Sequence, residues 1–136
     1  MIDLARTSDW QQALAEYIGS KRDEPFEYGE NDCCMFAAGA VMAITGTDPV
    51  PEFRGKYDSL KTSIKALKDI GGGRLDKVMD DKFPAIPIGK AQRGDLAWFD
   101  DSVGVVTGRF AWFVSDDGLE RVPMDMWDKA WGVDHG

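Results

Sequence analysis

The fold is decided by residues 31–46, which read NDCCMFAAGAVMAITG. Asn31 or Asp32 can cap a helix that begins at Cys33, runs to Ile44 and stops at Thr45-Gly46. This segment is apolar on every side and rich in Ala and Gly. A helix with that pattern belongs in the middle of a domain, because its small residues let neighbouring elements approach closely.

Helices are also predicted on both sides of this segment. Ser8 and Gln11 form a capping-box pattern ahead of a helix that ends at Gly19. After a proline-containing loop, Asp58 or Ser59 starts a helix over 60–70, which ends at three successive glycines. Apolar spacing places Ile64, Leu67 and Lys68 on the buried side of that helix. A short amphipathic helix over 75–79 follows.

The C-terminal half, from Pro84 onward, has a different pattern, with short β-favouring runs between turn signals. These runs are Leu96–Phe99, Val103–Thr107, Phe110–Val114 and Leu119–Val122. No helical crossover separates them, so antiparallel pairing is expected. The sequence therefore predicts a single α+β domain over 1–136, with N-terminal helices packed on a C-terminal antiparallel β-sheet.

Composition excludes several function classes. The 136 residues carry 16 basic and 24 acidic side chains, a formal net charge of -8. That balance argues against a nucleic-acid binder or an anionic-membrane binder, since both need clustered Lys and Arg. No apolar run is long enough to span a membrane and no secretory signal is visible, so synthesis in a cytosol is expected.

Metal and cofactor chemistry is not indicated either. Two cysteines and one histidine offer too few ligands for a zinc site, and no cofactor motif is present. Cys33 and Cys34 are adjacent, which excludes a strain-free disulfide between them. The pairs Asp80-Asp81, Asp100-Asp101 and Asp116-Asp117 are best explained as solvated turns.

Cys33 is the candidate nucleophile. It falls in the first turn of the predicted central helix, where unpaired amide groups and the helix dipole favour a thiolate. Only one of Cys33 and Cys34 can face a given cleft, since consecutive helical residues point about 100° apart. The alternative interpretation is a small, buried and inert thiol, which is common in helices.

Two motifs resemble those of NlpC-type cysteine peptidases, which are papain-like cell-wall endopeptidases. The first is Phe26-Glu27-Tyr28-Gly29 followed by Asp32-Cys33 at the start of an apolar helix. The second is Gly94-Asp95 before a strand. The resemblance covers about half of the chain and implies a papain-like NlpC-type fold with Cys33 at the nucleophile position.

The whole chain resembles a group of short proteins encoded in tail-gene clusters of bacteriophages and prophages. The shared features are an early Trp10, Thr45-Gly46-Thr47-Asp48-Pro49, Arg54-Gly55-Lys56-Tyr57, Gly94-Asp95 and Ala130-Trp131. This resemblance implies a virion protein of the tail tip or baseplate, made in the host bacterial cytoplasm. Its expected partners are other tail proteins, with peptidoglycan as a further candidate.

The catalytic pattern of the peptidases is broken in this chain. Ser102 stands where those enzymes have their catalytic histidine, and a serine hydroxyl is no base near neutral pH. The one histidine, His135, lies next to the last residue, and Asp100 or Asp101 would disfavour a neighbouring thiolate. The expectation is therefore a vestigial Cys33 in a degenerate, inactive peptidase. An active peptidoglycan endopeptidase or amidase is the alternative, and a cytosolic acyl-transfer or redox protein is a third.

A docking surface is expected near the C-terminus. Trp127 and Trp131 are four residues apart and could share one exposed face, which would serve for partner binding.

Overall fold

The computed structural model describes residues 4–134 and contains four α-helices and one six-stranded sheet. The elements are α1 Trp10–Lys21, α2 Cys33–Thr45, α3 Leu60–Ile70, α4 Leu75–Lys82, β1 Ala85–Ile86, the 3-10 turn η1 Ile88–Lys90, β2 Leu96–Phe99, β3 Ser102–Val106, β4 Phe110–Ser115, β5 Gly118–Pro123, the 3-10 turn η2 Met124–Met126 and β6 Lys129–Trp131. The predicted α+β class with helices before an antiparallel sheet is confirmed.

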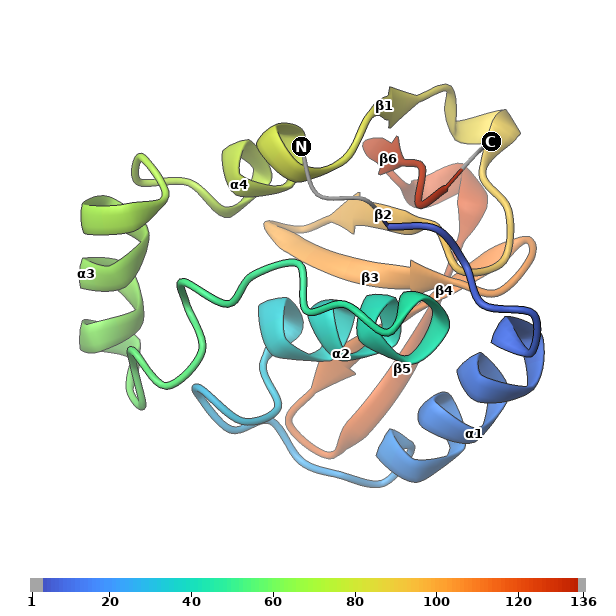
Figure 1. Cartoon of the computed structure of the whole chain (residues 1–136). Helices are drawn as coiled ribbons and strands as arrows, with labels where there is room; N and C mark the ends of the chain where they lie inside the picture. The colour runs from blue at the N-terminus through green and yellow to red at the C-terminus, as the bar shows by residue number, and fades with distance from the viewer. Residues whose placement is uncertain (1–3, 135–136) are drawn as a thin grey trace.

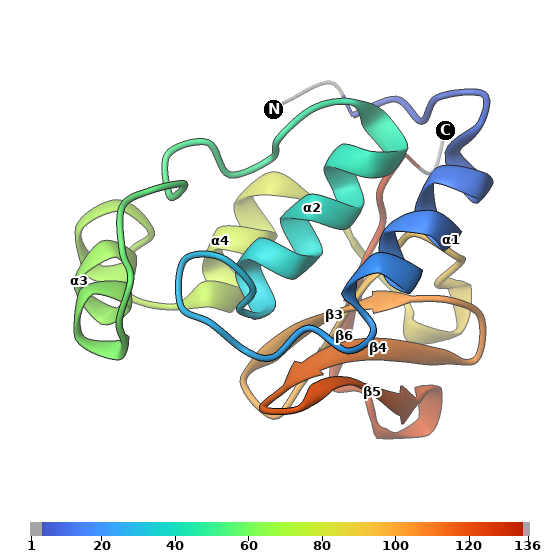
Figure 2. The same ribbon diagram turned by 90° about the horizontal axis from the view of Figure 1, so that it is seen from below.

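α2 is the central helix, as the sequence predicts. It lies beside α1 on one face of the sheet and packs against β3 and β4 (Figures 1 and 2). Phe36, Val41 and Ile44 on this helix are almost completely buried. Gly39 allows the close approach of α1, because a Cβ there would collide with the ring and hydroxyl of Tyr17. Gly46, at φ +79°, ends the helix in the left-handed conformation that glycine adopts without strain.

The strand order is β1-β6-β2-β3-β4-β5, and every pairing is antiparallel. The last strand, β6, is therefore inserted between β1 and β2. α2 covers one face of the sheet, and a smaller apolar cluster that includes Phe113 and Trp127 covers the other. A two-residue turn joins β2 to β3, with Asp100 at φ +51° and Asp101 at φ +58°. Positive φ at both positions matches the right-handed twist of a tight hairpin.

The start of α1 differs from the prediction. Asp9, rather than Ser8, occupies the N-cap position, and no side chain caps the helix there. The Asp9 carboxylate instead accepts a 2.9 Å hydrogen bond from the hydroxyl of Thr7. The helix also continues beyond Gly19 to Lys21, since an exposed glycine weakens a helix without ending it.

α3 has the predicted bounds but not the predicted buried face. It begins with a capping box in which Ser59 and Thr62 each accept from the other's backbone N–H, at 3.2 and 3.0 Å. Ile64 is 57% exposed and Lys68 is also exposed, which corrects the expected buried side. The reason is that α3 projects from the rest of the domain (Figure 1), so that only one edge of the helix meets other elements.

α4 extends three residues past the predicted Met79, to Lys82. Over residues 4–134, none of the helices combines the length and the hydropathy that crossing a membrane requires.

Candidate functional site

The site is built at the N-terminus of α2. Of the two predicted caps, Asp32 is the one used: its Oδ1 accepts a 2.8 Å hydrogen bond from the backbone N–H of Met35. Oδ2 accepts two more, from the backbone N–H of Gly29 at 2.8 Å and from the hydroxyl of Tyr57 at 2.7 Å. The buried Asp32 carboxylate therefore lies at the positive end of the α2 helix dipole, which stabilises its negative charge.

Gly29 and Asn31 hold the loop that precedes the site. A Cβ on Gly29 would collide with the carbonyl oxygen of Tyr57, and φ at Gly29 is +83°. Asn31 is 1% exposed and donates from Nδ2 to the carbonyl oxygens of Glu24 and Pro25, at 3.1 and 3.0 Å. The aromatic-glycine motif before Asp32 thus lets the chain pass closely beside Tyr57.

Cys33 and Ser102 lie together, as their positions in the motifs imply. Both side chains line one cavity, where the start of α2 faces the start of β3. Burial raises the pKa of the Cys33 thiol and the nearby Asp32 carboxylate raises it further, although hydrogen bonding from the backbone of Val103, the Ser102 side chain and the backbone of Cys34 acts in the opposite direction. Backbone amides at the helix start lower the pKa of Cys33, as the sequence predicts, but burial outweighs them, so the expected preference for a thiolate is not found.

Cys34 is the more deeply buried thiol, and it lines the same cavity as Cys33, so the expectation that only one of them can face a given cleft is wrong. It is buried in the main core cluster, and burial raises its thiol pKa well above the usual range. The two adjacent thiols thus have different environments, with only Cys33 partly exposed.

A cavity of about 270 Å³ opens beside Cys33. Its lining is largely apolar and aromatic and comes from Phe26, Tyr28, Asp32, Cys33, Cys34, Phe53, Tyr57, Ser63, Leu67, Leu75 and Ser102. α3 forms one wall through Ser63 and Leu67, so the projecting helix helps to enclose the site. A larger cavity of about 480 Å³, between Glu52, Ile70 and Lys82, contains none of the predicted site residues.

The titratable side chains that line the smaller cavity do not include a suitable general base. Asp32 already accepts three hydrogen bonds, and burial raises the pKa of Tyr57, which is held as a donor to that carboxylate. Asp100 and Asp101 are exposed at the β2–β3 turn and do not line the cavity. His135 lies outside the described residues. Within residues 4–134, no group of three or more His, Cys, Asp or Glu side chains is arranged to hold a metal ion.

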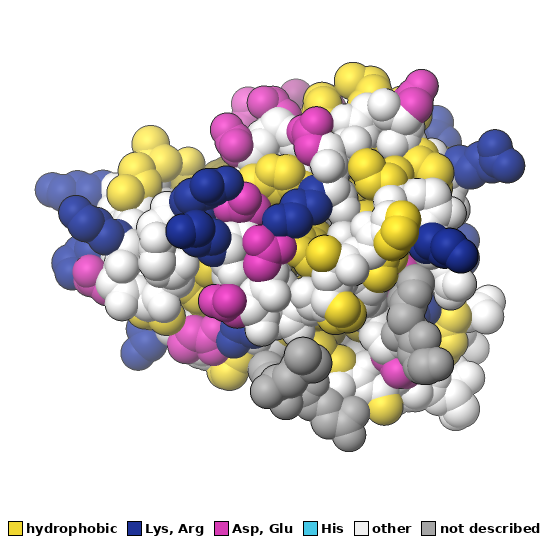
Figure 3. All heavy atoms as spheres, turned by 90° about the horizontal axis from the view of Figure 1, so that it is seen from above, with side chains coloured by type: hydrophobic (Ala, Val, Ile, Leu, Met, Phe, Trp, Pro, Cys, Tyr) yellow, Lys and Arg dark blue, Asp and Glu magenta, His cyan; other side chains and the backbone are white. Residues whose placement is uncertain are grey.

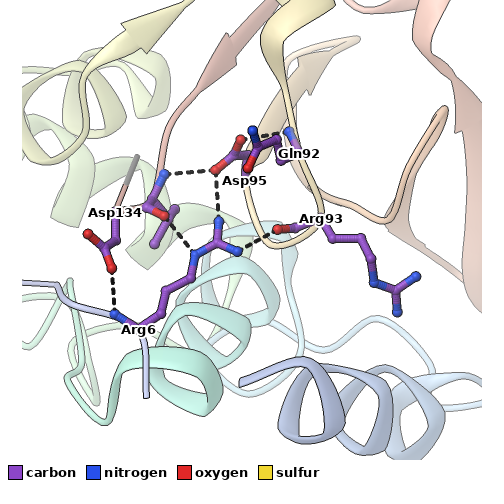
Figure 4. Close-up of polar contacts among 6 residues, drawn as sticks. Arg6, Gln92, Arg93, Asp95 and Asp134 are labelled. Carbon is purple, nitrogen blue, oxygen red and sulfur yellow. Dashed lines mark hydrogen bonds and ion pairs between the residues drawn. The ribbon is translucent and has the colours of Figure 1, made fainter. Parts of the chain in front are cut away.

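Asp95 of the Gly-Asp motif has a structural role (Figure 4). Its buried Oδ1 accepts from Arg6 at 3.1 Å and from the backbone N–H of Val133 at 2.9 Å, while Oδ2 accepts from the backbone N–H of Gln92 at 2.7 Å. Arg6 also donates to the carbonyl oxygen of Val133 at 2.9 Å. The motif therefore joins the first and last described segments of the chain to the start of β2.

The expected docking face at Trp127 and Trp131 is not present. Trp131 is fully buried, and its Nε1 donates to Asp80 at 2.9 Å. Trp127 is 5% exposed and donates to the carbonyl oxygen of Val122 at 3.0 Å. The segment between them is not a helix, so a spacing of four does not create a common exposed face. Both rings are part of the core.

Tyr57 and the aromatic wall of the cavity were not identified as site residues from the sequence. Tyr57 is separated from Asp32 by 25 positions, and only the Arg-Gly-Lys-Tyr segment of the phage-cluster resemblance drew attention to it.

Comparison with known proteins gives one family match. The family model described as "Domain of unknown function (DUF6950)" matches residues 5–133, nearly the whole chain. No curated protein and no solved structure matches the chain.

Proposed function

The chain belongs to the DUF6950 family, and we propose that it is a structural protein of a bacteriophage tail tip or baseplate. In this proposal it has a papain-like, NlpC-type fold that no longer cleaves peptides. It acts by binding neighbouring tail proteins as the tip assembles.

The observation that carries the non-catalytic assignment is that Ser102 lines the cavity beside Cys33. Peptide cleavage by a thiol needs a base that takes the proton and delivers it to the leaving amine. A hydroxyl beside the sulfur supplies a hydrogen bond but cannot perform that transfer near neutral pH. The raised pKa of Cys33 supports the same conclusion, because the thiol stays protonated and is a weak nucleophile.

The tail location is supported by the resemblance to the phage tail-cluster proteins, and the structure gives two of the shared segments a role. Tyr57 of Arg-Gly-Lys-Tyr binds the helix cap, and Asp95 of Gly-Asp binds Arg6. Both shared segments thus stabilise the fold, which a protein that acts through protein–protein contacts must maintain.

The catalytic question is tested with purified peptidoglycan fragments. Wild-type protein and the Cys33→Ala variant should both release no new amine termini. A release that occurs with the wild-type protein and disappears in the variant would overturn the non-catalytic assignment.

The location is tested on particles purified from the phage that encodes the chain. Quantitative mass spectrometry should find the protein at a small, fixed copy number relative to the other tail proteins. Its absence from purified particles would overturn the tail assignment without affecting the result on catalysis.

The second candidate function is an active peptidoglycan endopeptidase or amidase. The cavity of about 270 Å³ beside the partly exposed Cys33 favours it, because such a space could admit a peptide side chain. This candidate requires a base outside residues 4–134, for which the sequence offers His135. It therefore predicts turnover that is lost in both Cys33→Ala and His135→Ala.

A further inference from the structure

A groove separate from both cavities described above lies between α1 and the first residues of β4. Figure 2 shows these two elements next to each other. The groove has a volume of about 240 Å³. Its walls include Gly19 from α1 and Arg22 directly after it, Arg93 and Thr107 from loops, and Phe110 and Trp112 from β4. Neither Cys33 nor Ser102 is part of it.

The arginines around this groove differ from three of the four elsewhere in the sequence, Arg109 being the exception. Arg6, Arg54 and Arg74 each bind a carboxylate, at 3.1, 2.7 and 2.6 Å. On the face in Figure 3, basic and acidic side chains lie next to one another. Among residues 4–134, by contrast, the guanidinium groups of Arg22, Arg93 and Arg121 form no ion pair. In a chain with a net charge of -8, these are cations without a carboxylate partner among the described residues.

Two of these cations share one aromatic ring. The guanidinium carbon of Arg22 lies 5.3 Å from the centre of the Trp112 ring, and that of Arg121 lies 5.8 Å from it. Arg121 also lies 5.0 Å from the ring of Phe110. Such contacts position the cations but do not neutralise their charge. An anion bound between them would relieve their mutual repulsion.

Arg93 and Thr107 add two further unsatisfied groups. The Arg93 side chain extends away from the Arg6–Asp95 pair (Figure 4), and only its backbone oxygen binds Arg6. The Oγ1 atom of Thr107 is buried and has no hydrogen-bond partner among the described residues. A buried hydroxyl without a partner is costly, and Thr107 is one of the residues that line the groove.

We propose that this groove binds an acidic segment of a partner polypeptide. Carboxylates of the segment pair with Arg22, Arg93 and Arg121, while its apolar side chains pack on Phe110 and Trp112. A short peptide segment suits the small volume. A nucleic-acid strand carries a phosphate at every nucleotide and extends beyond so small a groove, and the net charge of -8 disfavours such a ligand. The proposal does not depend on the chemistry of Cys33 or on the phage assignment.

The test uses the full chain and a fluorescein-labelled peptide of alternating Glu and Leu, with fluorescence anisotropy as the measurement. The matched control peptide has Gln in place of every Glu. We expect the Glu peptide to bind at least about tenfold more tightly, with an affinity that falls as salt is added. Equal binding of the two peptides, or no binding of either, would overturn the proposal.

Variants locate the binding. Arg22→Gln, Arg93→Gln and Arg121→Gln should each weaken the Glu peptide about tenfold, as expected for a lost charge-assisted hydrogen bond. Arg74→Gln removes the same charge elsewhere and should leave the affinity unchanged. Arg93→Gln is the decisive variant, because the side chain of Arg93 holds no described contact that folding depends on. Unchanged binding in Arg93→Gln contradicts the proposal, as does tighter binding of a labelled oligothymidylate than of the Glu peptide.

Discussion

The side chains of Ser102 and Cys33 line the same cavity, where the start of β3 faces the start of α2. A hydroxyl thus occupies the position beside the thiol that a catalytic imidazole would need.

An imidazole introduced at position 102 should activate the thiol. In a Cys34→Ala background, Ser102→His should raise the alkylation rate of Cys33 by iodoacetamide at pH 7 about tenfold or more, because one unit of pKa lowering gives about tenfold more thiolate. Ser102→Ala is the matched control and should react no faster than the parent, since it loses a hydrogen bond that lowers the pKa. Rapid alkylation of the parent protein already at pH 6 would contradict this account.

Neutralising the helix cap should also activate Cys33. The Asp32 carboxylate raises the thiol pKa, so Asp32→Asn should lower it and shift the pH profile of alkylation toward acid. The same variant should lose about 1–3 kcal/mol of unfolding free energy, since one carboxamide cannot accept all three hydrogen bonds. Tyr57→Phe separates the two effects: it should destabilise the fold without moving the profile toward acid.

The Arg6–Asp95 pair should be among the most sensitive contacts in the domain. Asp95 is completely buried, so Arg6→Met removes the cation from a buried ion pair and should cost about 3–5 kcal/mol in urea unfolding. Arg74→Gln, which breaks an ion pair whose arginine is 65% exposed, should cost less than about 1 kcal/mol. Similar losses in the two variants would show that Asp95 is not held as described.

Two glycines in helices should respond in opposite directions to alanine. Gly39→Ala places a methyl group against Tyr17 and should destabilise the fold by about 1–3 kcal/mol. Gly19→Ala meets nothing within 4 Å and should stabilise it by about 0.5–1 kcal/mol, because alanine favours the helix. Thermal unfolding followed by circular dichroism compares the pair directly, and a stabilising Gly39→Ala would show that α1 and α2 are not closely packed.

Local signals predicted most of the secondary structure. The bounds of α3 and β2 agree with the prediction, and β3 to β5 differ by one residue at the strand ends. These elements have strong markers in the chain itself, such as Ser59 before α3 and the Gly94-Asp95 and Asp100-Asp101 turns around β2. The insertion of β6 between β1 and β2 has no such marker, because it depends on packing between distant segments.

The errors have a common cause. Ile64 has helical apolar spacing but is exposed because α3 projects from the body, and Trp131 looked available but is covered by the core. Neither outcome can be predicted from residue spacing. Spacing shows which residues share a face of an element, but not whether another element packs against that face. The positions of Cys33 and Ser102 were inferred from a resemblance, whereas Tyr57 at Asp32 and Arg6 at Asp95 required the three-dimensional structure.

The shared carboxylate of Asp95 also couples the segment at Arg6 to the segment at Val133. Arg6 and Val133 bind the same oxygen atom, and the backbone N–H of Arg6 donates to Asp134 at 2.7 Å. If the segment at Arg6 or the segment at Val133 detaches, Asp95 loses one of its hydrogen-bond donors and the other segment is held less firmly. The two segments should therefore unfold locally together rather than one after the other. A fusion partner that loosens the segment at Arg6 would consequently also lower the local stability of the segment at Val133.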